Sequence, residues 1–345
     1  MRVSVTFQPL SETDPAGVRD LLVGTVWKRD WSKDIAEAYF AWRYRARENG
    51  DTLVASDQGR CVGVLDSFTR PYWIDGREQI VRETCDWFCL PEYRAFGVGL
   101  HLMRRMMAKP EPILAIGGTA YTRDLLPRLK WARLPDVSNY LLGVSARTLA
   151  ALAAHKRWRA GIPLARAVPN IQLIWRIPQH PAPSASCEVR LRVLGEATEL
   201  GAIAPYAVAP TLGARVLDWL AHAPAVLGQF VQLSFYCDGE LAGISISRLE
   251  ELPSAGRFAK IVHLHAARLE MIDWMLSVTA SHLVEHGAGA VLARVSCPAT
   301  ASSLSSLGFW KLQSSPAHWW PAKAVPPAGL LNLTALQADD ALQFT

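Results

Sequence analysis

The sequence contains no run of about eighteen apolar residues, so no part of it is predicted to cross a membrane as a helix. Its first seven residues alternate like a strand and lack the apolar region of a signal peptide. The six cysteines are scattered, and none forms a Cys-x-x-Cys pair. We therefore expect reduced thiols in a cytoplasmic protein, rather than a disulfide framework or a zinc site. The formal net charge of +5 is modest and the basic residues are dispersed, which does not indicate a nucleic-acid partner.

Two common phosphate-binding motifs are also missing. A Walker loop requires Gly-Lys-Ser or Gly-Lys-Thr, and neither tripeptide occurs in the chain. A dinucleotide-binding fingerprint would need a third glycine where His101 or Leu102 stands. If the chain binds phosphate groups, it must therefore do so with a loop of another kind.

The most informative stretch reads as a strand, a turn and the start of a helix. Residues 80–90 are rich in β-branched and aromatic side chains, and apolar residues recur at helical spacing from Val98 onwards. Between strand and helix stand Arg94, Gly97 and Gly99. Glycine permits positive φ angles and close approach of the backbone, a helix start offers free N–H groups, and the arginine adds a charge. This combination predicts a pyrophosphate-binding loop.

The motif resembles the acetyl-CoA loop of the GNAT superfamily of N-acetyltransferases, in which Pro-Glu-Tyr-Arg/Gln-x-x-Gly-x-Gly joins a strand to a helix. Residues 91–99 read Pro-Glu-Tyr-Arg-Ala-Phe-Gly-Val-Gly in that same context. The resemblance implies acetyl-CoA, or another acyl-CoA, as co-substrate. It also implies a set of cofactor-binding residues at the end of the strand and in the loop: Phe88, Cys89, Leu90, Arg94, Ala95, Phe96, Gly97, Val98, Gly99 and Leu100. The alternative is a structural corner that uses glycine for geometry alone.

The order of the expected elements agrees with this resemblance. Strands are expected at residues 52–56, 61–68, 79–90, 113–116 and 140–144. Two helices are expected before the first of these strands, and another helix begins at residue 98. The fold class is therefore α/β (an α+β mixed sheet). The family's fold would make this sheet splayed and would hold CoA in the splay.

Transfer of an acyl group to an amine needs a base and a proton donor for the leaving thiolate. The resemblance places a glutamate eleven residues before the arginine of the loop, which is Glu83 here. Asp86 is the second candidate, and it points to the other face of the strand unless a bulge intervenes. The family's tyrosine falls on Leu126, so Tyr121, earlier on the same helix, is the substitute. The alternative for each carboxylate is an ion pair with a neighbouring arginine.

The chain also repeats itself. Four positions of the first half recur 177 to 180 positions later with similar flanks: Trp42 as Trp219, Gly63 as Gly243, Gly76 as Gly256, and Trp131 as Phe309. This near-constant interval predicts two copies of one fold, as two tandem GNAT-like acyl-CoA N-acyltransferase domains.

We expect a GNAT-like acyl-CoA-binding domain at 1–177, a proline-rich linker at 178–186, and a second, degenerate GNAT-like domain at 187–345. Segment 274–279 is expected to lie opposite the loop of the first copy, and it contains no glycine. One acyl-CoA site per chain is therefore expected. His263 and His265 share one face of a strand, but no third ligand stands at a recognised spacing, so no metal site is predicted.

The predicted function is an acyl-CoA-dependent N-acyltransferase, of the N-acetyltransferase type, in which the amine attacks the thioester directly in a ternary complex. A small-molecule or sugar amine is the expected acceptor, with no nucleic-acid and no membrane partner. Two alternatives stay open. One is a non-catalytic acyl-CoA-binding pseudoenzyme, and the other is a Fem-like aminoacyl or peptidyl transferase, which also pairs such folds.

Overall fold

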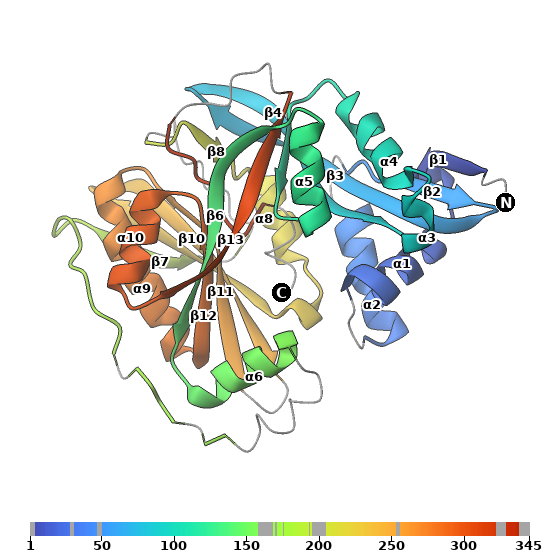
Figure 1. Ribbon diagram of the computed structural model, residues 1–345. Helices are drawn as coiled ribbons and strands as arrows, with labels where there is room; N and C mark the ends of the chain where they lie inside the picture. Colours follow the sequence, from blue (N-terminus) through green and yellow to red (C-terminus); the bar gives the residue numbers. More distant parts are fainter. Residues whose placement is uncertain are drawn as a thin grey trace. The chain divides into compact units, whose positions relative to one another are not determined.

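The computed structural model forms two compact units, shown together as a ribbon in Figure 1. It describes residues 4–27, 31–46, 50–157, 168–169, 171–174, 176–192, 194, 205–252, 256–321 and 329–337. The amino-terminal unit comprises Met1–Tyr72, Glu78–Leu134 and Pro316–Pro326. The carboxy-terminal unit comprises Trp73–Arg77, Pro135–Ser315 and Pro327–Thr345.

The amino-terminal unit alternates strands and helices in the expected order. Its elements are β1 (Val5–Pro9), α1 (Pro15–Leu22), α2 (Lys33–Phe40), β2 (Leu53–Asp57), β3 (Arg60–Ile74), β4 (Arg77–Cys89), α3 (Pro91–Arg94), α4 (Val98–Met107), β5 (Ile113–Ile116) and α5 (Ala120–Arg128). Strands β1 to β5 lie side by side in sequence order, followed by the end of β13 (Trp310–Trp320). The β1–β2 and β2–β3 pairs are antiparallel, whereas β4 and β5 are parallel. The sheet is therefore mixed, as predicted.

The helices of this unit begin where the local sequence requires. The Asp14 side chain caps α1 by accepting hydrogen bonds from the amides of Ala16 and Gly17, and Pro15 occupies the first helical position. Ser32 caps α2 through the amide of Ile35. Helix α2 then continues into a π-helical turn, Ala41–Arg45, which carries buried polar side chains toward the sheet.

Helix α4 closes one face of this sheet. Its buried residues Leu102, Met103 and Met106 pack in one core with Val62 and Leu65 of β3. These side chains follow the helical spacing that the sequence shows, and each is at most 1% exposed. The apolar face fixes the helix, and with it the loop that precedes it, against the central strands.

The carboxy-terminal unit also combines strands and helices. Its elements are β6 (Ala132–Gly143), α6 (Ala146–Arg157), β7 (Glu188–Arg192), β8 (Val208–Pro210), α8 (Ala214–Ala221), β9 (Gln229–Cys237), β10 (Glu240–Leu252), β11 (Gly256–Ala266), α9 (Ile272–Glu285), β12 (Ala288–Val295), α10 (Pro298–Ser306) and β13. The strand order is β13, β6, β12, β11, β10, β9, β7. Strands β11 and β12 are parallel, like β4 and β5, and β9–β10–β11 are antiparallel.

Two glycines show that the units are copies of one fold. A Cβ atom on Gly63 of β3 would lie 3.3 Å from Leu102 of α4, and one on Gly243 of β10 would lie 2.5 Å from Met275 of α9. Each glycine thus faces the helix that follows the next strand. The positions are those of the repeat, so the spacing in the sequence reflects a repeated packing contact.

The corner before the last strand of each copy is repeated as well. Lys130 and Gly308 have φ angles of 64° and 88°, both in the left-handed region. The amides of the next residues, Trp131 and Phe309, each bond to the carbonyl five residues earlier, at 3.1 and 3.0 Å. Both helices α5 and α10 therefore end in the same backbone motif.

The compact units divide the chain differently from the predicted domains. Residues 135–177 group with the carboxy-terminal unit, where Gly143 of β6 pairs with Ala290 of β12. Conversely, the end of β13 groups with the amino-terminal unit, where Trp320 pairs with Ile113 of β5. Each copy's last strand thus belongs in part to the other unit. The ranges 1–177 and 187–345 remain our proposal for the two copies.

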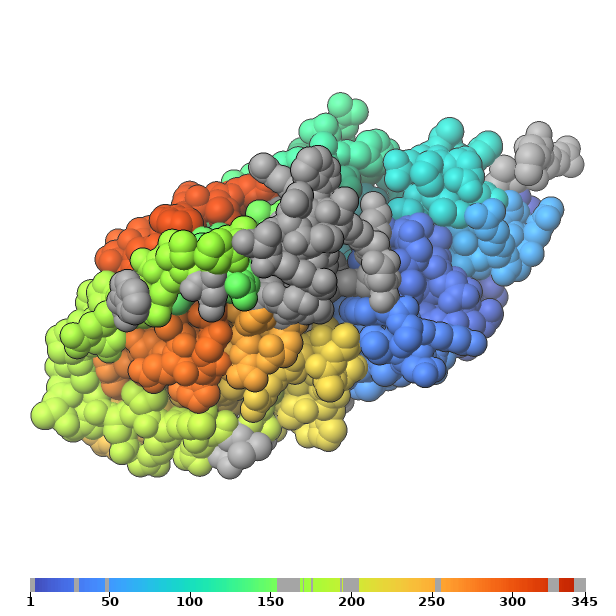
Figure 2. Space-filling model, turned by 90° about the horizontal axis from the view of Figure 1, so that it is seen from below, coloured from blue at the N-terminus to red at the C-terminus, as the bar shows by residue number. Residues whose placement is uncertain are grey.

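The predicted linker, residues 178–186, contains no helix or strand. It is nevertheless attached to the carboxy-terminal unit, since Gln179 donates to Ser281 Oγ at 2.7 Å and the His180 amide to Ser277 Oγ at 3.3 Å. Both serines belong to α9. In the space-filling view of Figure 2 the yellow-green part of the chain, which includes this stretch, lies on the surface beside orange residues. Among the described residues, no helix combines the length and apolar character that a membrane crossing requires.

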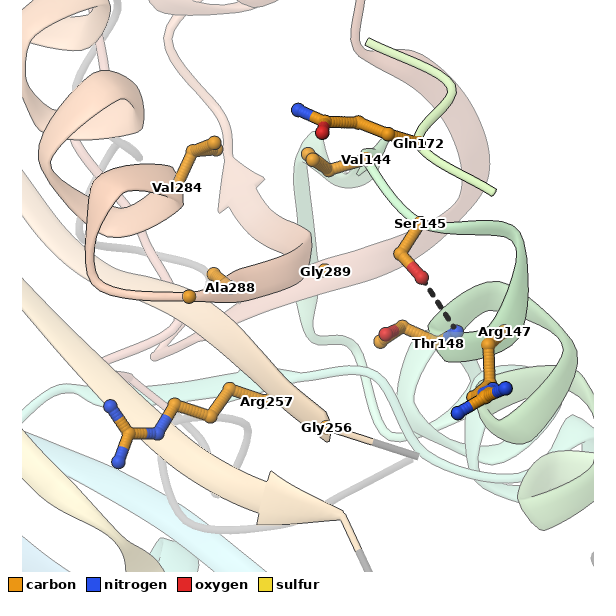
Figure 3. Close-up of a pocket in the computed structure, with 11 residues that line it drawn as sticks. Val144, Ser145, Arg147, Thr148, Gln172, Gly256, Arg257, Val284, Ala288 and Gly289 are labelled. Carbon is orange, nitrogen blue, oxygen red and sulfur yellow. Dashed lines mark hydrogen bonds between the residues drawn. The ribbon is translucent and has the colours of Figure 1, made fainter. Parts of the chain in front are cut away.

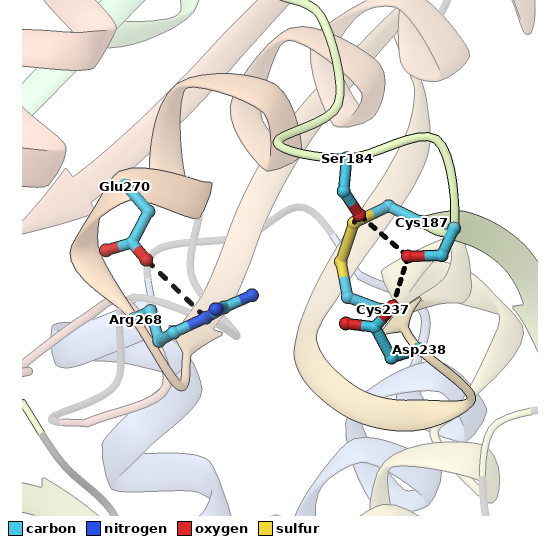
Figure 4. The surroundings of a disulfide bond; sticks show 7 residues. Ser184, Cys187, Cys237, Asp238, Arg268 and Glu270 are labelled. Carbon is cyan, nitrogen blue, oxygen red and sulfur yellow. Dashed lines mark hydrogen bonds and ion pairs between the residues drawn. A yellow bond between two sulfur atoms is a disulfide. The ribbon is translucent and has the colours of Figure 1, made fainter.

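The expectation that all cysteines are reduced is wrong for one pair. Cys187 and Cys237 form a disulfide, whose surroundings Figure 4 shows. Strand β7 pairs with β9 so that Glu188 lies opposite Tyr236, which brings the two cysteines together although they stand 50 residues apart. Spacing alone could not reveal this, because the pairing depends on strand register. Cys61, Cys85, Cys89 and Cys297 are buried and form no disulfide.

Counting thiols tests this disulfide. Denatured without reductant, the protein is expected to react with an alkylating reagent at four cysteines, and at all six after reduction. Mass spectrometry of tryptic peptides would locate the protected pair at residues 187 and 237. Six reactive thiols in unreduced protein would contradict the disulfide.

Candidate active site

The candidate site begins where β4 and β5 separate. The two strands pair in parallel from Arg82 opposite Ile113 to Thr84 opposite Ala115. Beyond this pair, β4 continues to Cys89, whereas β5 ends at Ile116. Among the described residues, no other strand pairs with β4 on the side of β5. The backbone groups from residue 85 onwards therefore face a gap in the sheet, as the predicted splay requires.

The loop between β4 and α4 lies at the mouth of this gap. The amide of Gly97 bonds to the Arg94 carbonyl at 3.0 Å, and Gly97 takes a φ of 70° as the N-cap of α4. The first helical hydrogen bond runs from His101 to the Gly97 carbonyl. The amides of residues 98–100 precede this bond and have no partner within the helix. They form the positive end of the helix dipole, and the first turn carries no acidic residue.

The two glycines of the loop have different surroundings. A Cβ atom on Gly97 would meet nothing within 4 Å, whereas one on Gly99 would lie 3.5 Å from Trp87 Nε1 and 3.6 Å from Cys89 Cβ. The Trp87 indole also donates to the Gly99 carbonyl at 3.0 Å. Gly97 therefore supplies a left-handed corner with open space beside it, and Gly99 lets the helix approach the strand. An anionic group fits beside Gly97.

The other predicted cofactor residues line this loop and the end of β4. Arg94, Ala95 and Phe96 are exposed, so the Arg94 guanidinium can reach a bound anion. Its Nε lies 3.5 Å from the Cys89 carbonyl, at the end of the strand. The remaining residues are half-buried or buried between strand and helix: Phe88, Cys89, Leu90, Val98 and Leu100.

The two cysteines of β4 are buried and hydrogen-bonded. Cys85 donates to Asp66 Oδ2 at 2.9 Å, and Cys89 Sγ lies 3.4 Å from the Leu90 carbonyl. Burial raises the pKa of the Cys89 thiol above its usual value and outweighs the opposite effect of the Arg94 charge. Covalent transfer of the acyl group through Cys89 is therefore disfavoured.

Glu83 lies on β4 just before the gap and is 1% exposed. The Tyr72 hydroxyl donates to its Oε1 at 2.6 Å, and Arg70 Nε lies 3.3 Å from the same oxygen. Burial raises the pKa of the Tyr72 phenol well above its usual value, and the Glu83 carboxylate raises it further. Glu83 thus lies within a buried ion pair, the alternative role that the sequence leaves open for it.

Asp86 occupies a local irregularity of β4. Its φ of 40° is in the left-handed region, so the strand bulges at this residue. Arg43 Nη2 lies 3.0 Å from Asp86 Oδ2, and the Tyr44 hydroxyl donates to the same oxygen. Burial raises the pKa of the Tyr44 phenol well above its usual value, with further contributions from Asp86, Asp66 and Cys85. At this bulge Asp86 contacts Arg43 and Tyr44, and the Tyr44 phenol also interacts with Cys85.

Four partners of these carboxylates were missed from the sequence: Arg43, Tyr44, Arg70 and Tyr72. Two of them, Arg70 and Tyr72, stand at even positions of β3, as does the buried Asp66, in a strand that is otherwise mainly apolar. Polar residues that recur with a period of two share one face of a strand, and this pattern could have revealed the buried polar face. Arg43 had no comparable signal, because its partner lies 43 residues away on another element.

Tyr121 is placed differently from both carboxylates. It stands in the first turn of α5, after the Thr119 cap, and is 67% exposed. Glu83 and Asp86 are buried in the sheet, so the three predicted catalytic residues do not form one cluster in this structure. The role of Tyr121 as proton donor stays a prediction.

The second copy has no glycine-containing loop before α9. The segment at this place is not 274–279, as predicted, but the connection that precedes it. Residues 274–279 lie inside α9, and the connection from β11 to α9 is formed by residues 267–271. This connection also contains no glycine. Glu270 and Asp273 stand at the start of α9, where the first copy has no acidic residue. Negative side chains at that place oppose the binding of phosphate.

A pocket of about 330 Å³ in the carboxy-terminal unit lies away from this connection. Figure 3 shows Ser145 and Arg147 at the start of α6 and Arg257 at the start of β11 on its wall. Arg257 is already bonded to Glu251 and to the His286 carbonyl. Val284, near the carboxyl end of α9, also lines the pocket, which therefore lies at the far end of this helix from the 267–271 connection and is not a second cofactor gap. Among the described residues, no group of three or more potential ligands could hold a metal ion.

Comparisons with known proteins support the fold. No protein-family model and no curated protein matches the sequence. A GCN5-related N-acetyltransferase from Anabaena variabilis matches with a TM-score of 0.59 at 13% identity, over 92% of this chain and 72% of that one. A probable N-acyltransferase from Enterococcus faecalis gives 0.55 at 11%, over 92% and 72%. A tandem GNAT protein from the clavulanic acid biosynthesis pathway gives 0.52 at 13%, over 92% and 98%. The chain therefore has the GNAT fold in tandem, as predicted.

Proposed function

We propose that this protein is an acyl-CoA-dependent N-acyltransferase with one cofactor site per chain, at the gap between β4 and β5. The observation that carries the proposal is the start of α4: amides without helical partners, a left-handed Gly97 with open space beside it, and the exposed Arg94. Pyrophosphate is bound by such groups. Acetyl-CoA is the proposed donor, and another acyl-CoA would use the same contacts.

Bound acyl-CoA would supply the activated acyl group. The amides of residues 98–100 and the Arg94 guanidinium would hold its phosphates. The unpaired backbone of β4 near Cys89 would align the pantetheine arm and polarise the thioester carbonyl. Glu83 is the proposed base for the acceptor ammonium, and Tyr121 the proposed proton donor to sulfur. The proposed acceptor is a small-molecule or sugar amine, in the cytoplasm.

A second candidate is a non-catalytic acyl-CoA-binding protein. It is favoured by the two buried ion pairs, because a carboxylate held by an arginine is a weaker base than a free one. Both candidates use the same loop and differ in the fate of the thioester.

Calorimetry and an activity assay together test the proposal. Titration with CoA is expected to give one site per chain, since the connection before α9 contains no glycine and Asp273 lies in the first turn of α9. Release of CoA thiol from acetyl-CoA with a panel of amines is then expected for at least one acceptor. Binding without turnover across the panel would favour the non-catalytic candidate, and no binding would exclude both. Two equivalent sites would contradict the assignment of the second copy.

A further inference from the structure

The second copy has a gap between strands like that of the first. Strands β11 and β12 pair in parallel from Arg257 opposite Ala288 to Ile261 opposite Ala293. Strand β11 then continues to Ala266. Its second half therefore diverges from β12, as the end of β4 diverges from β5. In the first copy this gap is the proposed cofactor site.

The gap of the second copy is filled by the chain itself. Residues 331–337 are all buried. Thr334 forms an antiparallel bridge with Val295, the last residue of β12. The Ser296 amide donates to the Leu333 carbonyl at 2.9 Å, and Ser296 Oγ accepts from the Leu333 amide, also at 2.9 Å. The segment is thus joined to the end of β12 by one backbone hydrogen bond and by one to the Ser296 side chain.

The other edge of the segment is paired as well. Leu331 forms a parallel bridge with Val208 of β8, and the Asn332 amide donates to the Val208 carbonyl at 2.7 Å. The Ala207 amide donates to the Leu330 carbonyl at 2.8 Å. Hydrogen bonds on both edges hold residues 331–334 between two elements of the same unit, and residues 335 and 336 form a turn.

Two side chains of the segment reach β11. Asn332 donates to the Leu264 carbonyl at 3.1 Å and lies 3.3 Å from His265 Nδ1. Thr334 Oγ1 lies 2.9 Å from His263 Nδ1. All four side chains are at most 3% exposed. Burial lowers the pKa of His265 to about 4, so this imidazole is neutral at neutral pH and can accept from Asn332.

We propose that the gap of the second copy is a peptide-binding slot whose ligand is this chain's own carboxy-terminal segment, residues 330–337. The slot binds an extended strand through Ser296 and through the backbone of Val208. The side-chain contacts of Asn332 and Thr334 make this binding depend on the sequence of the strand. The connection before α9 has no phosphate-binding glycines, so the slot is a site for peptide rather than for acyl-CoA.

Cleavage of the full-length protein tests the slot. A protease recognition sequence is inserted after Pro326, where the chain passes from one compact unit to the other. After the cut, the carboxy-terminal fragment is expected to stay with the rest of the protein through gel filtration. Release at once from a protein that remains folded by circular dichroism would overturn the proposal.

A second measurement keeps the receiving protein wild type. A fluorescent synthetic peptide of residues 327–345 is added to the cut protein and should replace the fragment. The peptide with Asn332→Ala is expected to bind at least about tenfold more weakly, because the Leu264 carbonyl and His265 lose a buried partner. In the uncut protein, Asn332→Ala should lower the melting temperature, whereas Ser305→Ala, at an exposed serine of α10, should not. Equal binding of both peptides would overturn the proposal.

Binding of residues 330–337 in the slot does not depend on acyl transfer by the first copy. Loss of CoA binding in a variant of the first copy's loop would leave the fragment bound. Conversely, the peptide exchange is expected to leave CoA binding unchanged.

Discussion

Replacing Gly97 with valine is expected to abolish acyl-CoA binding while the protein stays folded. Gly97 has a φ of 70°, a conformation that costs residues with a Cβ about 1–2 kcal/mol and β-branched residues more. The new side chain would also occupy the open space beside the first-turn amides, where the phosphates are proposed to lie. Calorimetric titration with CoA measures the effect, and circular dichroism checks the fold.

Arg94→Ala should act differently at the same loop. It removes a charge-assisted contact of ~1.5–3 kcal/mol and leaves the backbone unchanged, so CoA binding should weaken by roughly ten- to a hundredfold or slightly more. The loss should be larger at low ionic strength. Arg268→Ala, in the corresponding connection of the second copy, is the matched control and should bind like the parent. If Gly97→Val and Arg94→Ala both bind normally, the loop is a structural corner and the acyltransferase proposal fails.

Changing Glu83 to glutamine is expected to reduce kcat by about 10²–10⁴-fold with little change in CoA affinity. The amide cannot accept the proton of the acceptor ammonium. Because Arg70 loses its buried counter-charge, the melting temperature should also fall, so turnover is compared at a temperature where the variant is fully folded. Glu78→Gln, at an exposed position of the same strand, is the control and should change neither value.

Asp86→Asn distinguishes the two carboxylates. If it abolishes turnover while Glu83→Gln does not, the base is Asp86, on the bulge held by Arg43. If neither substitution changes kcat, neither carboxylate is the base. The pair of variants therefore decides a question that burial leaves open, since both side chains are fully enclosed.

The loop could be predicted from the sequence because everything that defines it is local. A strand, two glycines and the apolar spacing of α4 fall within about twenty residues, the range over which spacing and propensity are informative. The mixed sheet followed from the same reasoning, and the likeness to solved GNAT folds confirms it. The copies themselves were visible because turns and close contacts recur at a constant interval, as at Gly63 and Gly243.

Long-range partners could not be predicted in the same way. Arg43 and Asp86 stand 43 residues apart, and Cys187 and Cys237 are joined by the register of two strands. The bulge at Asp86 reverses the simple alternation of a strand, so the face of its side chain was uncertain. Residues 330–337 carry no regular pattern. Their pairing with Val208 and Val295 depends on the gap between β11 and β12, which spacing along the chain does not reveal.

The corners at Lys130 and Gly308 have a consequence beyond packing. A lysine in the left-handed region costs roughly 1 kcal/mol relative to glycine, and the first copy tolerates this because the same hydrogen bonds close the turn. At this place the two copies share a dihedral angle and not a residue type. The turn is therefore defined by its hydrogen bond and its positive φ angle, and the residue that adopts this angle differs between the copies.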